Sequence, residues 1–201
     1  MQNGNWGIVK IDSTGTVFPV AVPAPAPIPG IGNFQWRFPA GDVTPDGSKM
    51  YINAQVTSNA SVANQTLYIY NIAAGTVDTK TKTFPGFTTV NVADWAVNPI
   101  DGNLYGASYT GQIFQMDPNG TNAVITKVGD TPLLPSGSPG QPLDAYGGAW
   151  FNADGHFFAY RNVGEIYEID LDLPLPATPT IVSTQSGGPS SDYNDAAACA
   201  F

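Results

Sequence analysis

The feature that most constrains the fold of this chain is a pattern that occurs three times along the sequence. Asp-Gly dipeptides stand at residues 46–47, 101–102 and 154–155, roughly 54 residues apart. Each is followed by a short apolar or aromatic segment and then by a segment with alternating apolar residues: KMYINAQ and TLYIYNI, NLYGASY and GQIFQMD, HFFAYRN and GEIYEID. Alternation with a period of two is typical of a β-strand with one buried face. The pattern therefore predicts three copies of one β-structured unit.

Two further segments complete each copy. A stretch rich in small and aromatic residues precedes each turn (FPAGDVTP, VADWAVNP, YGGAWFNA), and a fourth strand-like stretch closes the copy (TVDTKTKTF, NAVITKVGD, TPTIVSTQ). Four short strands joined by Asp-Gly and Asn-Gly turns, repeated at this spacing, are the signature of a β-propeller blade. We therefore predict an all-β fold, a β-propeller of four-stranded antiparallel blades. A β-sandwich whose hairpins resemble one another by coincidence remains the alternative.

The repeat divides the chain into complete and partial blades of a single propeller, residues 1–201. The expected blades cover residues 4–22 (partial), 35–84, 91–130, 145–185 and 190–201 (a closing strand). Because a closed ring needs about four or more blades, we expect the chain to be part of a longer protein. Its open strand edges would then pair with a missing N-terminal segment of the same protein or with another copy of the chain.

Composition narrows the functional classes. Acidic residues outnumber basic ones by 16 to 7, a net charge of -9 that disfavours binding to nucleic acid. No apolar run approaches the ~18 residues of a membrane span, which argues against membrane insertion. Only 11% of the residues are charged, and Gly (22) and Pro (18) are abundant, which favours a turn-rich extracellular protein. Asn-X-Ser/Thr sequons make Asn59, Asn64 and Asn119 candidate glycosylation sites.

Three stretches of the sequence resemble a known family. DWAVNPIDGNLYG, YGGAWFNADGHFFAYRNVGEIYEIDL and the tail SSDYNDAAACAF are similar, in the same order, to a propeller-like domain of unknown function. That domain is found in secreted and cell-surface proteins of bacteria and fungi, and its members carry a DWxxNPxDGxLYG blade and an NDGARC-like tail. The similarity spans roughly residues 35–200. It implies a propeller fold and an extracellular setting, and it implies no established chemistry.

The tail departs from the family pattern. NDAAAC stands where the family has Asn-Asp-Gly-Ala-Arg-Cys, so the turn glycine and the arginine are missing, and no role of that arginine carries over. Cys199 is retained and is the single cysteine of the chain, which indicates a partner elsewhere. The resemblance implies a disulfide between Cys199 and a cysteine near the start of the domain, in a segment missing from this sequence.

Few residues of the chain are candidates for chemistry. His156 is the single histidine, and no second histidine, cysteine or nucleophile motif accompanies it, so we interpret it as a polar residue at a strand start. Acidic residues at the starts of inner strands are better candidates, because these positions line the channel of a propeller. They predict a channel cluster that could hold a hard cation such as Ca²⁺, and they are Asp42, Asp94, Asp192 and Asp195. The alternative is that each carboxylate caps a turn or bonds neighbouring backbone amides.

The remaining candidates are aromatic. Trp36, Tyr109 and Tyr160 could stack on a sugar, with packing between blades as the alternative. No phosphate-binding loop, serine-hydrolase elbow or zinc-binding helix motif is present. The sequence thus predicts a non-enzymatic extracellular propeller, structural, adhesive or binding a glycan or protein, at a cell surface, matrix or filament. The alternative is a propeller hydrolase or lyase that acts on a carbohydrate or lactone with a metal at the central channel.

Overall fold

The computed structural model describes residues 8–11, 14–20, 36–56, 66–87, 90–137 and 142–191. Its strands are β1 (Ile8–Ile11), β2 (Val17–Val20), β3 (Trp36–Val43), β4 (Lys49–Val56), β5 (Thr66–Asn71), β6 (Thr76–Thr83), β7 (Ala96–Val97), β8 (Leu104–Ala107), β9 (Ile113–Asp117), β10 (Ala123–Val128), β11 (Tyr146–Phe151), β12 (Phe157–Arg161), β13 (Glu165–Asp170) and β14 (Thr180–Gln185). One short 3-10 turn, η1 (Pro142–Asp144), precedes β11, and no α-helix occurs in these ranges. The all-β prediction is confirmed.

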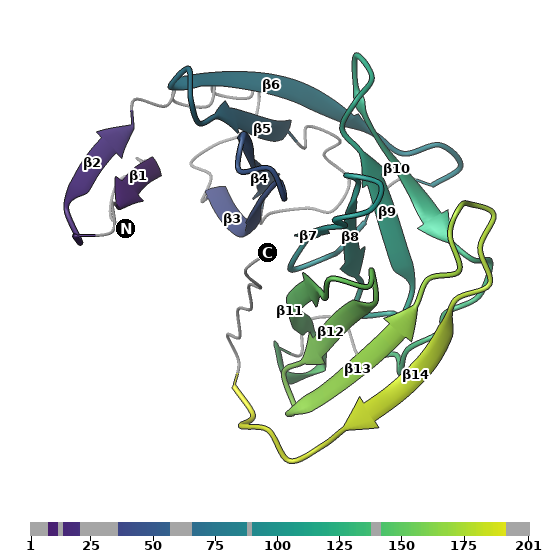
Figure 1. Cartoon of the computed structure of the whole chain (residues 1–201). Helices are drawn as coiled ribbons and strands as arrows, with labels where there is room; N and C mark the ends of the chain where they lie inside the picture. The colour runs from purple at the N-terminus through teal and green to yellow at the C-terminus, as the bar shows by residue number, and fades with distance from the viewer. Residues whose placement is uncertain are drawn as a thin grey trace.

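The strands β3 to β14 form three four-stranded antiparallel blades. The first blade is β3–β6, the second is β7–β10 and the third is β11–β14, with the strands of each paired in chain order. The inner strands β3, β7 and β11 lie beside one another, and β6, β10 and β14 lie at the outside (Figure 1). A separate antiparallel pair, β1 and β2, falls in the expected partial blade. The closing strand expected at 190–201 lies almost entirely outside the described residues.

The outer strands of the first two blades meet edge to edge, which the repeat pattern did not predict. Two residues at the end of β6 pair in parallel with two at the start of β10, so these blades form one eight-stranded sheet. Lys80 of β6 supports the junction, because its Nζ donates hydrogen bonds to the carbonyls of Pro118 and Gly120 in the β9–β10 turn. The two blades are therefore joined at their outer edges as well as through their faces.

Two apolar cores lie between the blades, one on each face of the second blade. Leu67 of β5 and Leu104 of β8 belong to the core between the first and second blades. In the core between the second and third blades, Tyr105 meets Phe151 edge to face, with 5.5 Å between ring centroids. Because both of its faces are covered, the second blade buries all four residues of β8, whereas the equivalent strand β12 (Phe157–Arg161) of the third blade buries two of its five residues.

In two of the three repeated turns, the aspartate of the Asp-Gly dipeptide accepts a hydrogen bond from a backbone amide of the turn. Asp46 and Asp101 each accept this bond from the amide two residues ahead, at 3.0 and 2.9 Å. In the third turn Asn152 takes this role instead, since its Oδ1 accepts from the amides of Asp154 and His156 at 3.1 and 2.9 Å. The glycines of the three turns have φ values of 68°, 73° and 84°, in the left-handed region that favours glycine.

Candidate functional site

The carboxylate of Asp42 joins the first blade to the second. Asp42 lies near the end of β3, and not at the start of an inner strand as the sequence predicts. Its Oδ1 accepts a hydrogen bond from the amide of Val43 at 2.8 Å. Its Oδ2 accepts one at 2.7 Å from the amide of Val97 in β7, 55 residues further along the chain. Burial raises the pKa of Asp42, and these two amide hydrogen bonds oppose the rise because they favour the ionised form.

Asp94 repeats this arrangement between the second and third blades. It lies just before β7 and is 3% exposed. Its Oδ1 accepts from the amide of Trp95 at 2.9 Å, and its Oδ2 accepts from the amide of Ala149 in β11 at 2.6 Å, again 55 residues further on. We call Asp42 and Asp94 the bracket aspartates.

The bracket aspartates satisfy backbone groups that the sheets leave open. β7 and β11 stand at the inner edges of their sheets, so no strand in the described part of the chain pairs with the outward amides of these two strands. A buried amide without an acceptor is costly, and a carboxylate is a strong acceptor. Both aspartates therefore bond backbone amides, which is the alternative to a cation site that the sequence left open.

The other half of the expected channel cluster lies outside the described residues. Asp192 and Asp195 are there, so their participation in a cation site stays a prediction. Within the described ranges, no group of three or more His, Cys, Asp or Glu side chains is arranged to hold a metal ion. The structure thus brings Asp42 and Asp94 to equivalent blade junctions, each occupied by its own pair of amides.

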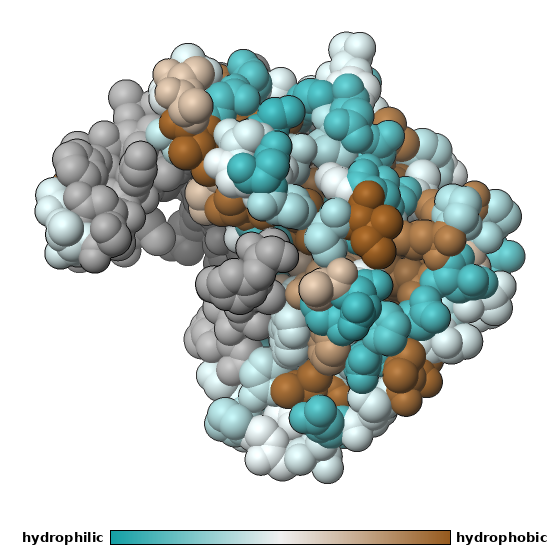
Figure 2. All heavy atoms as spheres, in the orientation of Figure 1, coloured by the Kyte–Doolittle hydropathy of each residue, from teal (hydrophilic) through white to brown (hydrophobic). Residues whose placement is uncertain are grey.

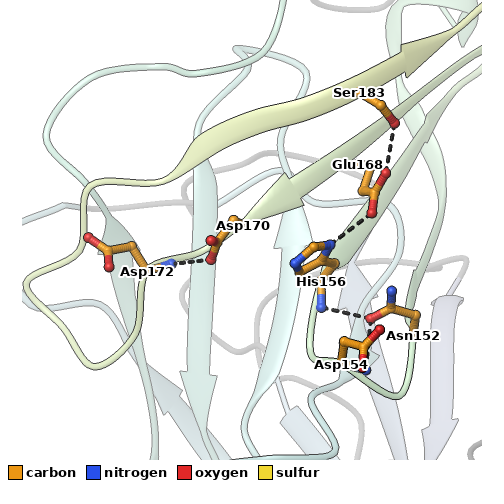
Figure 3. Close-up of polar contacts among 7 residues, drawn as sticks. All are labelled: Asn152, Asp154, His156, Glu168, Asp170, Asp172 and Ser183. Atoms are coloured by element: carbon orange, nitrogen blue, oxygen red, sulfur yellow. Dashed lines mark hydrogen bonds and ion pairs between the residues drawn. The ribbon is translucent and has the colours of Figure 1, made fainter.

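His156 belongs to a polar chain across the third blade that sequence analysis did not detect (Figure 3). Its Nδ1 lies 2.8 Å from Oε1 of Glu168 in β13. The other carboxylate oxygen, Oε2, accepts a hydrogen bond from Oγ of Ser183 in β14 at 2.7 Å. The carboxylate stands between the hydroxyl and the imidazole, so Ser183 is not activated by His156 as a hydrolase nucleophile would be.

The hydrogen bonds among His156, Glu168 and Ser183 favour the charged forms of the histidine and the glutamate. The hydrogen bond to Glu168 raises the pKa of His156, with smaller contributions from the negative charges of Glu168, Asp170 and Asp154. The hydrogen bonds from His156 and Ser183 lower the pKa of Glu168. The side chains of His156 and Glu168 are 32% and 23% exposed, so water screens the pair and its contribution to stability is small.

Two aromatic rings continue the same row of side chains toward the inner strand. The strand register places Trp150, Phe158, Glu168 and Ser183 opposite one another across β11, β12, β13 and β14. The rings of Trp150 and Phe158 are stacked, with 5.1 Å between centroids and 9° between planes.

Figure 2 shows that, on the side of the molecule in view, apolar side chains form separate patches between polar ones.

The aromatic residues expected to stack on a sugar are not gathered in one place. Trp36 lies in β3, and its side chain is outside the described residues. Tyr109 is half-buried beside the β8–β9 turn, and its backbone carbonyl accepts the amide of Gly137. Tyr160 lies in β12 of the third blade and donates its hydroxyl to the carbonyl of Pro189 at 2.5 Å. Sugar stacking by these three residues stays a prediction.

A buried lysine lies at the junction of the first two blades. Lys82 of β6 is 3% exposed, and its Nζ donates a hydrogen bond to Oδ1 of Asn53, which is also buried. Burial lowers the pKa of Lys82 to about 7. The burial of Lys82 cannot be read from the sequence, because TVDTKTKT has the pattern of a polar, solvent-facing strand, and it is β10 and the second blade that cover one end of it.

An ion-pair cluster fixes the segment before the third blade. Arg161 at the end of β12 contacts Asp144 through Nη2 at 2.9 Å and Glu165 through Nη1 at 3.1 Å. Tyr167 donates its hydroxyl to the same Glu165 carboxylate at 2.7 Å. Since the guanidinium of Arg161 contacts both carboxylates, we interpret the cluster as structural.

The predicted glycosylation and disulfide residues are mostly outside the described ranges. Asn59, Asn64 and Cys199 fall there. Asn119 is exposed in the β9–β10 turn, where its Nδ2 donates to Oδ1 of Asp117 at 3.0 Å. Its glycosylation stays a prediction.

Comparison with known proteins gives the family of the chain. A family model described as a repeat of unknown function, DUF6923, matches residues 1–201. The chain belongs to the DUF6923 repeats. A search of curated proteins finds no match to this DUF6923 chain. The predicted resemblance is thereby confirmed as far as a repeat of unknown function. Among the described residues of the chain, no helix is long and apolar enough to cross a membrane.

Solved structures similar to the DUF6923 chain are considerably longer. One is a structural genomics protein of unknown function from Bacteroides thetaiotaomicron VPI-5482, with 16% identity and a TM-score of 0.53, covering 84% of this chain and 36% of that one. The Dos1 propeller matches with 13% identity, a TM-score of 0.49 and coverage of 78% and 35%. The Cps50 (Swd1) β-propeller domain of Myceliophteria thermophila matches with 12% identity, a TM-score of 0.44 and coverage of 77% and 43%.

These comparisons leave the activity open, and the blades of the structure itself show the fold. The DUF6923 chain spans less than half the length of each of these three solved chains. Its three four-stranded blades, arranged with their inner strands together, are the architecture of a β-propeller. The predicted fold class is confirmed.

Proposed function

We propose that this DUF6923 propeller is a non-enzymatic module that is structural, adhesive or ligand-binding. The observation that carries the proposal is the use made of the bracket aspartates. In an enzyme built around a propeller channel, inner-strand carboxylates would be available to a metal or substrate. Here Asp42 and Asp94 each use both oxygens to hold backbone amides of two blades. Their role as inter-blade connections supports a scaffold rather than a catalytic centre.

We place the module outside the cell, at a surface or in a matrix or filament. Support comes from the low proportion of charged residues, from the abundance of glycine and proline, and from the exposed sequon at Asn119. A glycan or a protein is the proposed class of ligand. The acidic net charge of -9 makes nucleic acid an unsuitable partner.

A second candidate is a propeller hydrolase or lyase that acts on a carbohydrate or lactone. The observation that favours it is the pairing of His156 with Glu168, since an imidazole with a raised pKa on a partly exposed surface can donate a proton. In the form that the sequence suggested, this enzyme would also hold a metal at the channel mouth with Asp42, Asp94 and Asp192.

One set of measurements separates these candidates. Purified protein is screened against arrays of glycans and of extracellular proteins, and the same sample is assayed for turnover of sugars, esters and lactones. The proposal expects saturable binding without turnover, and binding that persists in a chelator. Turnover that stops when Glu168→Gln is introduced, or a stoichiometric metal in the purified protein, would favour the enzyme instead.

A further inference from the structure

The outer strands of the three blades differ in what covers their free edges. The outer strands β6 and β10 of the first two blades pair with each other. The outer strand of the third blade, β14, pairs with β13 on one side, and no strand of the described residues pairs with its other side. A strand edge of this kind presents a row of backbone donors and acceptors to solvent.

β14 also lacks most of the features by which proteins block an exposed edge. Its sequence, TIVSTQ, contains no charge and no proline, and four of its six residues have the β-branched side chains that favour strands. By contrast, β6 carries Asp78, Lys80 and Lys82. The apolar side chains of Ile181 and Val182 are 39% and 51% exposed. Unpaired backbone and exposed apolar surface thus occur on the same strand.

One feature of β14 does interrupt its edge. The register with β13 shifts between Glu168 and Ile169, so Val182 is an extra residue in a β-bulge. A bulge twists a strand and disfavours pairing locally. It leaves Thr180 and Ile181 on one side, and Ser183 to Gln185 on the other, with the extended backbone that a partner strand needs.

We propose that β14 is a docking edge for β14 of a second copy of this chain, paired antiparallel about a two-fold axis. The β6–β10 junction is parallel and two residue pairs long, and it shows that the outer strands of two blades in this fold can join edge to edge into an eight-stranded sheet. Two copies of β14 can also pair without repulsion between facing side chains, because the strand carries no charged residue. A two-fold axis uses the same edge on both copies and therefore closes at a dimer.

The charge of the chain gives this interface a salt dependence. Each copy carries a net charge of -9, so two copies repel at low ionic strength. Salt screens that repulsion beyond a distance of about 10 Å at 0.1 M, while the backbone hydrogen bonds and apolar contacts of β14 are affected little. Association should therefore strengthen as salt is added. This inference goes beyond the proposed function, because pairing through β14 requires no ligand.

The test is sedimentation velocity of the 201-residue chain over a concentration series at low and high salt. We expect a monomer–dimer equilibrium that shifts toward dimer at higher salt. Val182→Lys places a charge on the edge and should weaken dimerisation about tenfold or more. Val163→Lys is the matched control, because Val163 is 37% exposed in the β12–β13 turn of the same blade and receives the same change. It should dimerise as the unmodified chain does.

Hydrogen exchange of the unmodified chain gives an independent readout, which does not depend on the folding of any variant. The amides of β14 should exchange more slowly as concentration rises, and those of the buried strand β8 should not change. The proposal is overturned if the chain is monomeric at every concentration and salt. It is equally overturned if folded Val182→Lys dimerises like Val163→Lys, or if β14 exchange is independent of concentration in a sample that dimerises.

Discussion

The Asp94 carboxylate accepts a hydrogen bond of 2.6 Å from the backbone amide of Ala149, 55 residues away in the next blade. Asp42 and Val97 stand in the same relationship one blade earlier, at the same separation of 55 residues. A single side chain thus connects the inner strands of consecutive blades, and the connection repeats with the fold. Loss of a bracket aspartate should therefore lower stability at a blade junction.

Asp94→Ala should lower the free energy of unfolding by about 2–4 kcal/mol, because a charge-assisted hydrogen bond is lost and the buried Ala149 amide has no acceptor. Asp94→Asn keeps one acceptor oxygen and should cost less. The measurement is urea unfolding followed by tryptophan fluorescence. Asp130→Ala serves as the control, since Asp130 is exposed after β10 and should change stability by less than about 0.5 kcal/mol. Equal losses for the two alanine variants would contradict the bracket role.

Lys82 should make stability depend on pH near neutrality. Its pKa is about 7 in the folded chain, below its ordinary value of 10.5. Between these values the unfolded chain binds more protons, so stability should rise from pH 7 to pH 9, by at most about 1.4 kcal/mol per pH unit. The slope is measured by urea unfolding at successive pH values.

Lys82→Met should remove this slope, and Lys49→Met, which alters an exposed lysine of β4, should retain it. A slope that survives in Lys82→Met would show that another group is responsible for the pH dependence.

The imidazole of His156 should titrate above its ordinary pKa of 6.5, because Glu168 stabilises its charged form. Its contribution to stability is then present below pH 6.5 and lost as pH rises through the folded pKa of His156. Glu168 acts in the opposite sense, with a contribution present above pH 4.5 and lost as pH falls through its own lowered pKa. Nuclear magnetic resonance of the single histidine follows the titration directly. Glu168→Gln should lower the His156 pKa, and no change in that pKa would rule out the pairing in solution.

Gly106 of β8 should not tolerate a side chain. A Cβ at this position would lie 2.3 Å from Cγ1 of Val92 and 2.5 Å from the carbonyl oxygen of Asp94. Gly106→Ala should therefore destabilise the chain by about 1–3 kcal/mol through overpacking of the inner part of the second blade. Gly120→Ala in the exposed β9–β10 turn, where the nearest contact is 3.3 Å, should cost less in the same unfolding measurement. The reverse order would place the close approach at Gly106 in doubt.

The sequence predicts most of the fold because each strand carries a local pattern. The alternating apolar residues of TLYIYNI and GEIYEID, with the Asp-Gly turns before them, are enough to place the three blades. The β6–β10 junction has no such pattern, since TVDTKTKT reads as polar and exposed on its own. It becomes partly covered only when two blades are set side by side, and that is also why the buried environment of Lys82 was not foreseen.

The candidate site was predictable in its residues and not in its contacts. Asp42 and Asp94 stand out as acidic residues near inner strands, but the groups they bind are backbone amides, which every residue except proline provides. The position of each aspartate in the folded chain alone decides which backbone amide its carboxylate reaches. Glu168 and Ser183 similarly looked like ordinary polar residues of exposed strands. The strand register is what brings Glu168 opposite Ser183 and within reach of His156.

The most direct test of the central claim is thermal unfolding of the unmodified chain and of Asp94→Ala, each with added calcium and with a chelator. If the bracket aspartates hold backbone amides, neither calcium nor chelator should shift the midpoint of the unmodified chain, and Asp94→Ala should unfold at a lower temperature under all conditions. A midpoint that rises with calcium and falls with chelator in the unmodified chain, and responds to neither in Asp94→Ala, would contradict the account and make Asp94 a cation ligand.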